Sequence, residues 1–185
     1  VAGRDARLLH IVRGDALRYG YRLALDAETA LPLQSELRTA DQQVVSRIMF
    51  TDLALGADAV TTAADFELPN EPAAATLGAG SPTAELPASW QFVDMPPGFV
   101  MHGYRRKHGS AGPLSRQHFL LTDGLARVSV YVEPEHPGVL SGAVQLGSIS
   151  ALAQAHGDHW VTLIGEVPPQ TLQRILAGLQ PVPAG

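Results

Sequence analysis

A stretch without large apolar side chains divides this chain and sets the main limit on its fold. Residues 66–87 read FELPNEPAAATLGAGSPTAELP and consist mostly of Pro, Ala, Gly, Ser and Thr. Such a segment cannot bury enough apolar surface to form a core, and its composition is typical of a semi-extended linker with glycine hinges. We therefore expect two domains, residues 1–65 and 88–185, joined by residues 66–87.

The first domain has the two-residue periodicity of β-strands. RYGYRLALD, residues 18–26, alternates apolar and polar side chains, and residues 31–38 and 44–50 continue the pattern between turn-like segments. The apolar positions of the first of these strands are Tyr19, Tyr21, Leu23 and Leu25. Residues 7–50 are predicted to form an antiparallel meander, and these four residues either belong to its core or line a lipid pocket.

The second domain contains the strongest hairpin signal in the sequence. QHFLLT and LARVSVYVE flank an Asp-Gly pair at residues 123–124, which is the preferred two-residue turn between antiparallel strands. Further strands are expected in residues 142–155 and 159–167. After Pro168 and Pro169 the period changes to that of a helix, which should cover one face of the sheet. The apolar positions of this helix are Leu172, Ile175, Leu176 and Leu179.

The strand after the Asp-Gly pair has one apolar and one polar face. Ala126, Val128, Val130 and Val132 alternate with Arg127, Ser129, Tyr131 and Glu133. The polar face carries no recognisable acid, base or nucleophile arrangement. It either recognises a peptide through side-chain contacts or is simply solvated.

Composition excludes several classes of function. The net charge of -5 argues against broad binding to nucleic acid, which requires a basic surface. The chain has no cysteine, hence no disulfide and no cysteine-type zinc site. No apolar run approaches the roughly 20 residues that span a bilayer.

No catalytic or metal-binding motif stands out. His156 and His159 in HGDH provide two of the three or four ligands that zinc needs, so a solvated turn is the simpler explanation. Neither a nucleophile elbow nor a phosphate-binding glycine loop occurs. We expect no enzyme activity, no cofactor and no metal, although a hydrolase with dispersed acidic residues stays open because carboxylate catalysis is invisible without geometry.

One dense basic run occurs at Arg105, Arg106 and Lys107, at the end of an expected strand. It is either a solvated strand end or an anchor for an acidic partner segment or an anionic lipid head group, since the guanidinium fork suits carboxylate and phosphate. The residues proposed for partner binding are Arg105, Arg106, Arg127, Tyr131 and Glu133.

Several segments together resemble one family, the RseB regulators of the sigma-E envelope-stress pathway, called MucB in pseudomonads. The similarity lies in GRDARLL, RYGYRLALDAETALPL, MPPGF, TDGLARVSVYVEP and VTLIGEVPPQTLQRI, and it covers nearly the whole chain outside the linker. The resemblance implies a mainly β (α+β) protein. Part of a lipoprotein-carrier-like open antiparallel β-barrel would be followed by a small antiparallel domain with a C-terminal helix.

The resemblance also implies a function. Family members bind the periplasmic region of a membrane-anchored anti-sigma factor of the RseA/MucA type and protect it from the site-1 protease. Lipid or lipopolysaccharide signals, such as lipid A or lipoprotein acyl chains, relieve that inhibition. The alternative is a periplasmic carrier of lipid or lipoprotein.

Two expectations concern the cell and the assembly. By resemblance the protein belongs in the periplasm, and the chain starts where the large domain is already partly built, without a signal peptide. Residues 1–65 would then present unpaired strand edges, which are usually covered or paired. We expect a partner chain or a homodimer to cover them.

Overall fold

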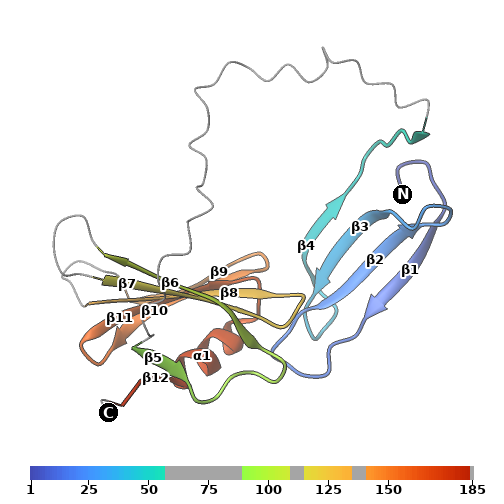
Figure 1. Ribbon diagram of the computed structural model, residues 1–185. Helices are drawn as coiled ribbons and strands as arrows, with labels where there is room; N and C mark the ends of the chain where they lie inside the picture. The colour runs from blue at the N-terminus through green and yellow to red at the C-terminus, as the bar shows by residue number, and fades with distance from the viewer. Residues whose placement is uncertain (57–88, 109–114, 135–140, 184–185) are drawn as a thin grey trace.

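A computed structural model describes residues 1–56, 89–108, 115–134 and 141–183 (Figure 1). The predicted linker at residues 66–87 lies outside the described residues, so the proposed domain boundaries stay predictions.

The first half of the chain forms an antiparallel meander, as the alternating pattern predicts. Its strands are β1 (Ala6–Ile11), β2 (Gly20–Asp26), β3 (Pro32–Arg38) and β4 (Val44–Met49). They pair in the order β1-β2-β3-β4, with irregularities in register after Ala24 and after Leu37. Within the described residues, the outer edges of β1 and β4 are not paired with another strand.

The second half forms a six-stranded antiparallel sheet. Its strands are β6 (Val100–His108), β7 (Ser115–Thr122), β8 (Arg127–Pro134), β9 (Gly142–Leu146), β10 (Ile149–His156) and β11 (His159–Gly165). Their order is β6-β7-β8-β11-β10-β9, so β8 is a central strand. The predicted hairpin joins β7 to β8, but its loop has four residues, 123–126, instead of the two of the Asp-Gly pair, and Gly124 has a φ of +94°.

A helix and two short strands lie on one side of this sheet (Figure 1). Helix α1 (Pro169–Ala177) packs on β10 and β11 through its buried Leu172 and Ile175. Strands β5 (Trp90–Phe92) and β12 (Leu179–Pro181) pair with each other. The spacing of Leu179 predicted that it belongs to the helix, and this was wrong. The helix ends at Ala177, Gly178 turns the chain, and Leu179 lies in β12.

The core of the second domain fills the space between α1 and the sheet. Phe119, Val130 and Leu163 are fully buried there, and Trp90 closes one end against His156 and His159. The predicted fold class is confirmed: the described chain consists of antiparallel sheets with one C-terminal helix and no closed barrel.

Gly178 provides a test of the packing between α1 and β5. A Cβ at Gly178 would overlap the carbonyl oxygen of Asp94, whereas a Cβ at Gly14 would meet no atom within 4 Å. We expect Gly178→Ala to lower the free energy of unfolding by about 1–3 kcal/mol, as overpacking does. Gly14→Ala should leave it unchanged or raise it slightly. Urea denaturation of both variants measures this, and equal stabilities would contradict the packing described.

Candidate partner-binding surface

The side of the six-stranded sheet away from α1 is called the open face here, and β8 contributes the polar side chains predicted for it. Val128, Val130 and Val132 of β8 are fully buried toward the helix. Arg127 is exposed on the open face, and Ser129, Tyr131 and Glu133 are half-buried there. Because β8 is central, a ligand can reach it only through these side chains and not by adding a strand to it.

Two side chains of β7 complete the open face. The rings of His118 and Tyr131 stack with centroids 4.4 Å apart, and the Nε2 of His118 lies 3.1 Å from the Oγ of Ser129. Arg116 donates a hydrogen bond of 2.6 Å from its Nε to Glu133. The result is a stacked pair of rings beside an exposed ion pair.

The basic run divides between the two sides of the sheet. Arg105 is exposed and lies directly opposite His118 in the register, so it extends the row Arg105, His118, Tyr131 and Thr162 across four strands. Arg106 is opposite the buried Gln117, on the side that faces the helix. The structure thus brings Arg105, Tyr131 and Glu133 onto one surface and places Arg106 on the other.

Sequence reasoning missed His118 and Arg116 because it took the Asp-Gly pair as a two-residue turn. Such a turn would place His118 opposite Ser129. The observed loop has four residues and pairs Thr122 with Arg127, which brings His118 opposite Tyr131.

The four residues predicted to line a lipid pocket lie on one face of the first sheet. Tyr19 is buried, burial raises its pKa, and its hydroxyl accepts a hydrogen bond of 3.2 Å from Gln145 of β9. Tyr21, Leu23 and Leu25 are half-buried on the same face of β2. The role of these four residues in lipid binding stays a prediction.

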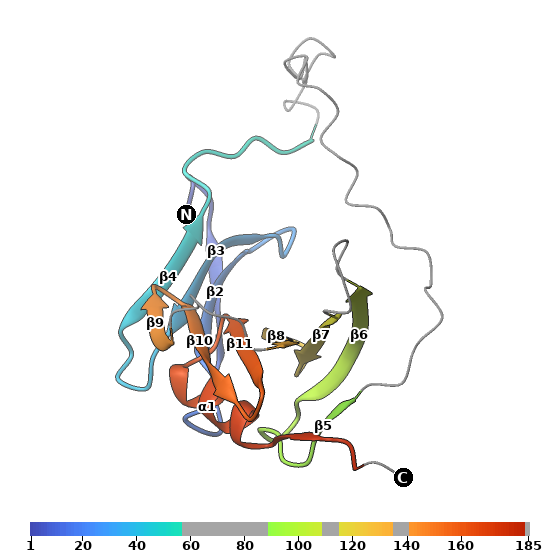
Figure 2. The same cartoon turned by 90° about the vertical axis from the view of Figure 1, so that its left-hand side faces the viewer.

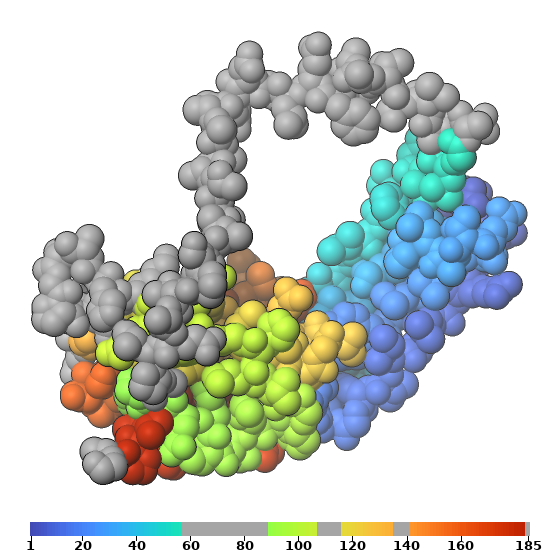
Figure 3. Space-filling view, in the orientation of Figure 1, coloured from blue at the N-terminus to red at the C-terminus, as the bar shows by residue number. Residues whose placement is uncertain are grey.

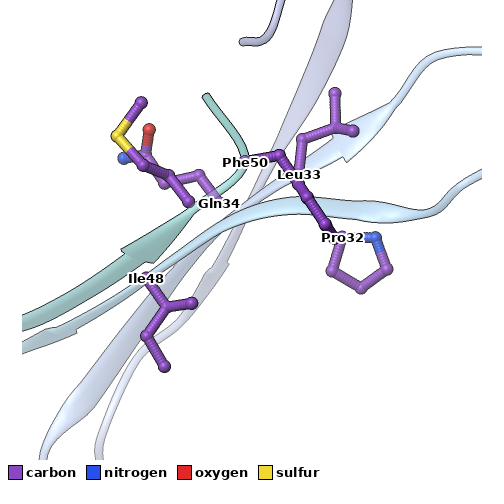
Figure 4. Close-up of a pocket in the computed structure, with 6 residues that line it drawn as sticks. Pro32, Leu33, Gln34, Ile48 and Phe50 are labelled. Atoms are coloured by element: carbon purple, nitrogen blue, oxygen red, sulfur yellow. The ribbon is translucent and has the colours of Figure 1, made fainter. Parts of the chain in front are cut away.

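A small cavity lies elsewhere on the first sheet, where the ends of β3 and β4 meet (Figure 4). Its volume is about 90 Å³, below the roughly 300–1,000 Å³ of typical ligand sites. The lining residues are Pro32, Leu33, Gln34, Ile48, Met49 and Phe50. Ile48 is 75% exposed at its rim.

The two sheets meet at residues 17–19, called the junction segment here. Thr171 of α1 donates a hydrogen bond of 2.6 Å to the carbonyl oxygen of Leu17. The Nε of Arg18 donates one of 2.6 Å to Asp123 in the β7–β8 turn. The turn between β9 and β10 also approaches the first sheet, since a Cβ at Gly147 would lie 3.1 Å from the carbonyl oxygen of Val45 on β4 (Figure 2).

A buried carboxylate organises the polar face of the first sheet. Glu36 is 1% exposed and accepts hydrogen bonds from Gln34, Arg38 and Arg47. The hydrogen bond from Arg38 is the main cause that lowers the pKa of Glu36, and burial opposes it. Alternation predicted a solvated glutamate here, but the stems of the surrounding arginines cover it.

Comparison with known proteins identifies the family. A family model of the MucB/RseB C-terminal domain matches residues 84–180, and one of the MucB/RseB N-terminal domain matches residues 1–74. This chain belongs to the MucB/RseB family. The resemblance read from the sequence is confirmed.

Curated relatives carry the names of regulatory proteins. The sigma factor AlgU regulatory protein MucB of Pseudomonas aeruginosa is 32% identical over 98% of this chain and 58% of its own length. The sigma-E factor regulatory protein RseB of Escherichia coli K12 is 23% identical over 97% of this chain and 56% of its own length. The chain therefore spans somewhat more than half of these relatives. Both names describe regulatory proteins.

Solved structures match the whole chain. A crystal structure of MucB in complex with MucA(peri) has a TM-score of 0.74 at 29% identity, over 100% of this chain and 65% of that one. The complex of Pseudomonas aeruginosa MucA and MucB has a TM-score of 0.72 at 29% identity, over 100% of this chain and 62% of that one. A crystal structure of MucB has a TM-score of 0.59 at 28% identity, over 98% of this chain and 60% of that one.

Within the described residues, no group of three or more His, Cys, Asp or Glu side chains could hold a metal ion. The Nδ1 of His159 lies 2.6 Å from a carboxylate oxygen of Asp158. No helix in that part of the chain is long and apolar enough to cross a membrane.

Three paired carboxylates predict how stability depends on pH. The pKa of Asp26 is lowered chiefly by its hydrogen bond from Arg4, and that of Glu36 by Arg38. Burial raises the pKa of Asp123, but hydrogen bonds from the amides of Ala126 and Leu125 and from Arg18 outweigh it. Because each pKa is lower in the folded chain, the stability these groups contribute is present above their unfolded values of about 4 and lost below them.

The free energy of unfolding should therefore stay nearly level from pH 7 to about 5.5 and fall as the pH drops below about 4.5. Glu36→Gln should lower it by about 1–2 kcal/mol at pH 7 and make the acid decline shallower. Denaturant titrations at several pH values measure both, and a wild-type profile that rises toward acid pH would contradict these assignments.

Proposed function

We propose that this chain binds the periplasmic region of an anti-sigma factor, protects it from regulated proteolysis, and does so in the periplasm. The observation that carries the proposal is the match of the whole chain to MucB in complex with MucA(peri), with a TM-score of 0.74. Membership of the MucB/RseB family supports the same conclusion.

The open face has the chemistry to recognise a polypeptide. The stacked His118 and Tyr131 give a rigid aromatic contact of the kind that is enriched at protein interfaces. Arg105 lies next to His118 in the register, and Arg127 lies four residues before Tyr131 on β8. Both are exposed and offer guanidinium forks to partner carboxylates. Residues Tyr131 and Arg127 form the centre of the proposed contact.

Release by lipid is the finer part of the proposal. Three of the residues that line the small cavity, Ile48 and Met49 at the end of β4 and Phe50 just after it, also expose apolar surface to solvent. An acyl chain of lipid A or of a lipoprotein would bury them, and a ligand that prefers one state of the protein shifts the population toward that state. The same surface favours a lipid carrier as the second candidate function.

Alanine substitution tests the open face. The double variant Arg127→Ala with Tyr131→Ala should weaken binding of the anti-sigma periplasmic region by about tenfold or more, which corresponds to about 1.4 kcal/mol. Calorimetric titration against the wild-type chain measures the change. Arg174→Ala is the matched control, because Arg174 lies on the helix and pairs with Asp94 at 3.2 Å, away from the open face.

Wild-type affinity in the double variant would remove the open face as the site. Failure of the wild-type chain to bind at all would contradict the proposed function. Purified wild-type protein that carries lipid and does not bind the anti-sigma region would favour the carrier.

A further inference from the structure

Arg18 of the junction segment uses every nitrogen of its guanidinium group. Its Nε donates to the Oδ2 of Asp123 at 2.6 Å and its Nη1 to the Oδ2 of Asp15 at 2.5 Å. Its Nη2 donates to the carbonyl oxygen of Pro97, and the group lies over the ring of Phe99, 5.3 Å from the centroid. An arginine held at each of its three nitrogens and on one flat side is strongly restricted in orientation.

The second domain is shaped to receive this side chain. Gly98 has a φ of +83°, and a Cβ there would lie 3.2 Å from the Nη2 of Arg18. The turn before Phe99 therefore needs glycine both for its backbone and for the room that Arg18 occupies. The side chain of Asp123 is 6% exposed, so the ion pair is largely removed from solvent and resists screening by salt.

The residues on either side of Arg18 are held as well. The hydroxyl of Thr171, which is fully buried in α1, donates to Leu17, and the hydroxyl of Tyr19 accepts from Gln145. Three successive residues thus contact three different parts of the second domain: α1, the β7–β8 turn and β9. In Figure 3 the blue surface of the N-terminal strands meets the green and yellow surface of that domain.

The contact between Arg18 and Asp123 lies next to β8, the strand that contributes polar side chains to the open face. Asp123 accepts hydrogen bonds from the amides of Leu125 and Ala126 through Oδ1, and from Arg18 through Oδ2. Arg127, the first residue of β8, follows directly. One carboxylate therefore connects the orientation of the first sheet with the start of the proposed binding strand.

The overall similarity of this chain to known structures is greater for two complexes than for one structure of MucB. The TM-scores against two MucA–MucB complexes are 0.74 and 0.72, and against a structure of MucB 0.59, although sequence identity and coverage of this chain are nearly equal. The arrangement in this chain is thus more similar to the two complexes.

We propose that the junction segment is a lock that holds the two sheets in one orientation, and that the anti-sigma factor region binds across both sheets in that orientation. The second clause rests on the proposed function. Arg18 and Asp123 are positioning residues: they do not touch the partner but set where the open face lies relative to the first sheet.

Asp123→Asn removes the contact with Arg18 and keeps the hydrogen bonds of the β7–β8 turn. The asparagine keeps an oxygen that can accept from Leu125 and Ala126, but it replaces the second carboxylate oxygen with an NH₂ group that cannot accept from Arg18. Asp94→Asn is the matched control, because Asp94 makes the same kind of ion pair with Arg174 within the second domain alone. Arg18→Lys is a second test, since one ammonium group cannot replace the three-way fork.

The orientation is measured by the distance between two spin labels. The chain has no cysteine, so Asp41→Cys in the β3–β4 turn and Gln173→Cys on α1, both exposed, give two unique labelling sites. We expect a single narrow distance distribution in the otherwise wild-type chain and with Asp94→Asn. With Asp123→Asn or Arg18→Lys it should broaden or gain a second maximum. Circular dichroism confirms folding, and Thr171→Val replaces any variant that does not fold.

Binding of the anti-sigma region to the same variants completes the test. We expect Asp123→Asn to weaken affinity by about tenfold and Asp94→Asn to leave it unchanged. A wild-type distance distribution in Asp123→Asn and Arg18→Lys would overturn the lock. A changed distribution with wild-type affinity would overturn the recognition clause. No binding by the wild-type chain would contradict the proposed function and that clause, while the distances would still decide the lock.

Discussion

The carboxylate of Asp123 is the point on which the relation between the two sheets depends. Its Oδ1 closes the β7–β8 turn and its Oδ2 receives Arg18 from the other sheet. The turn would form without Arg18, because Asp-Gly is a strong turn former by itself. Arg18 depends more on its surroundings, since Asp15, Asp123 and Pro97 are the groups that replace its water shell. The β7–β8 turn, which forms from local sequence, therefore holds Asp123 in place for its contact with Arg18 of the first sheet.

Local sequence patterns predicted the elements well but not the contacts between them. Alternation identified both faces of β8, and the Asp-Gly pair identified the hairpin, but the four-residue loop shifts the register by two residues from that of a two-residue turn. The role of Arg18 could not be read from local patterns, because two of its three acceptors lie 79 and 105 residues further along the chain. The burial of Glu36 was missed for a related reason. A period of two assigns a glutamate to the solvated face, whereas arginines from three strands cover it here.

The first sheet combines a polar face built around Glu36 with strand edges that remain open within the described residues. Leu8 and Leu9 on β1 and Ile48 on β4 expose apolar surface next to those edges. Unpaired, apolar edges are usually covered in native proteins, and the expectation of a partner chain or second copy there stays a prediction. The second domain differs, because its core is closed by α1 and its open face carries polar and aromatic groups. This contrast between a second domain with a closed core and a first sheet with open edges fits a first sheet that depends on further contacts.

The most direct test of the regulatory account is a proteolysis assay on the anti-sigma factor itself. The periplasmic region of the anti-sigma factor is incubated with its site-1 protease, with and without this chain at a concentration that saturates binding. The account predicts that cleavage slows in proportion to the fraction bound, with bovine serum albumin at the same concentration as the inert control. Cleavage at an unchanged rate while the anti-sigma region is fully bound would contradict it.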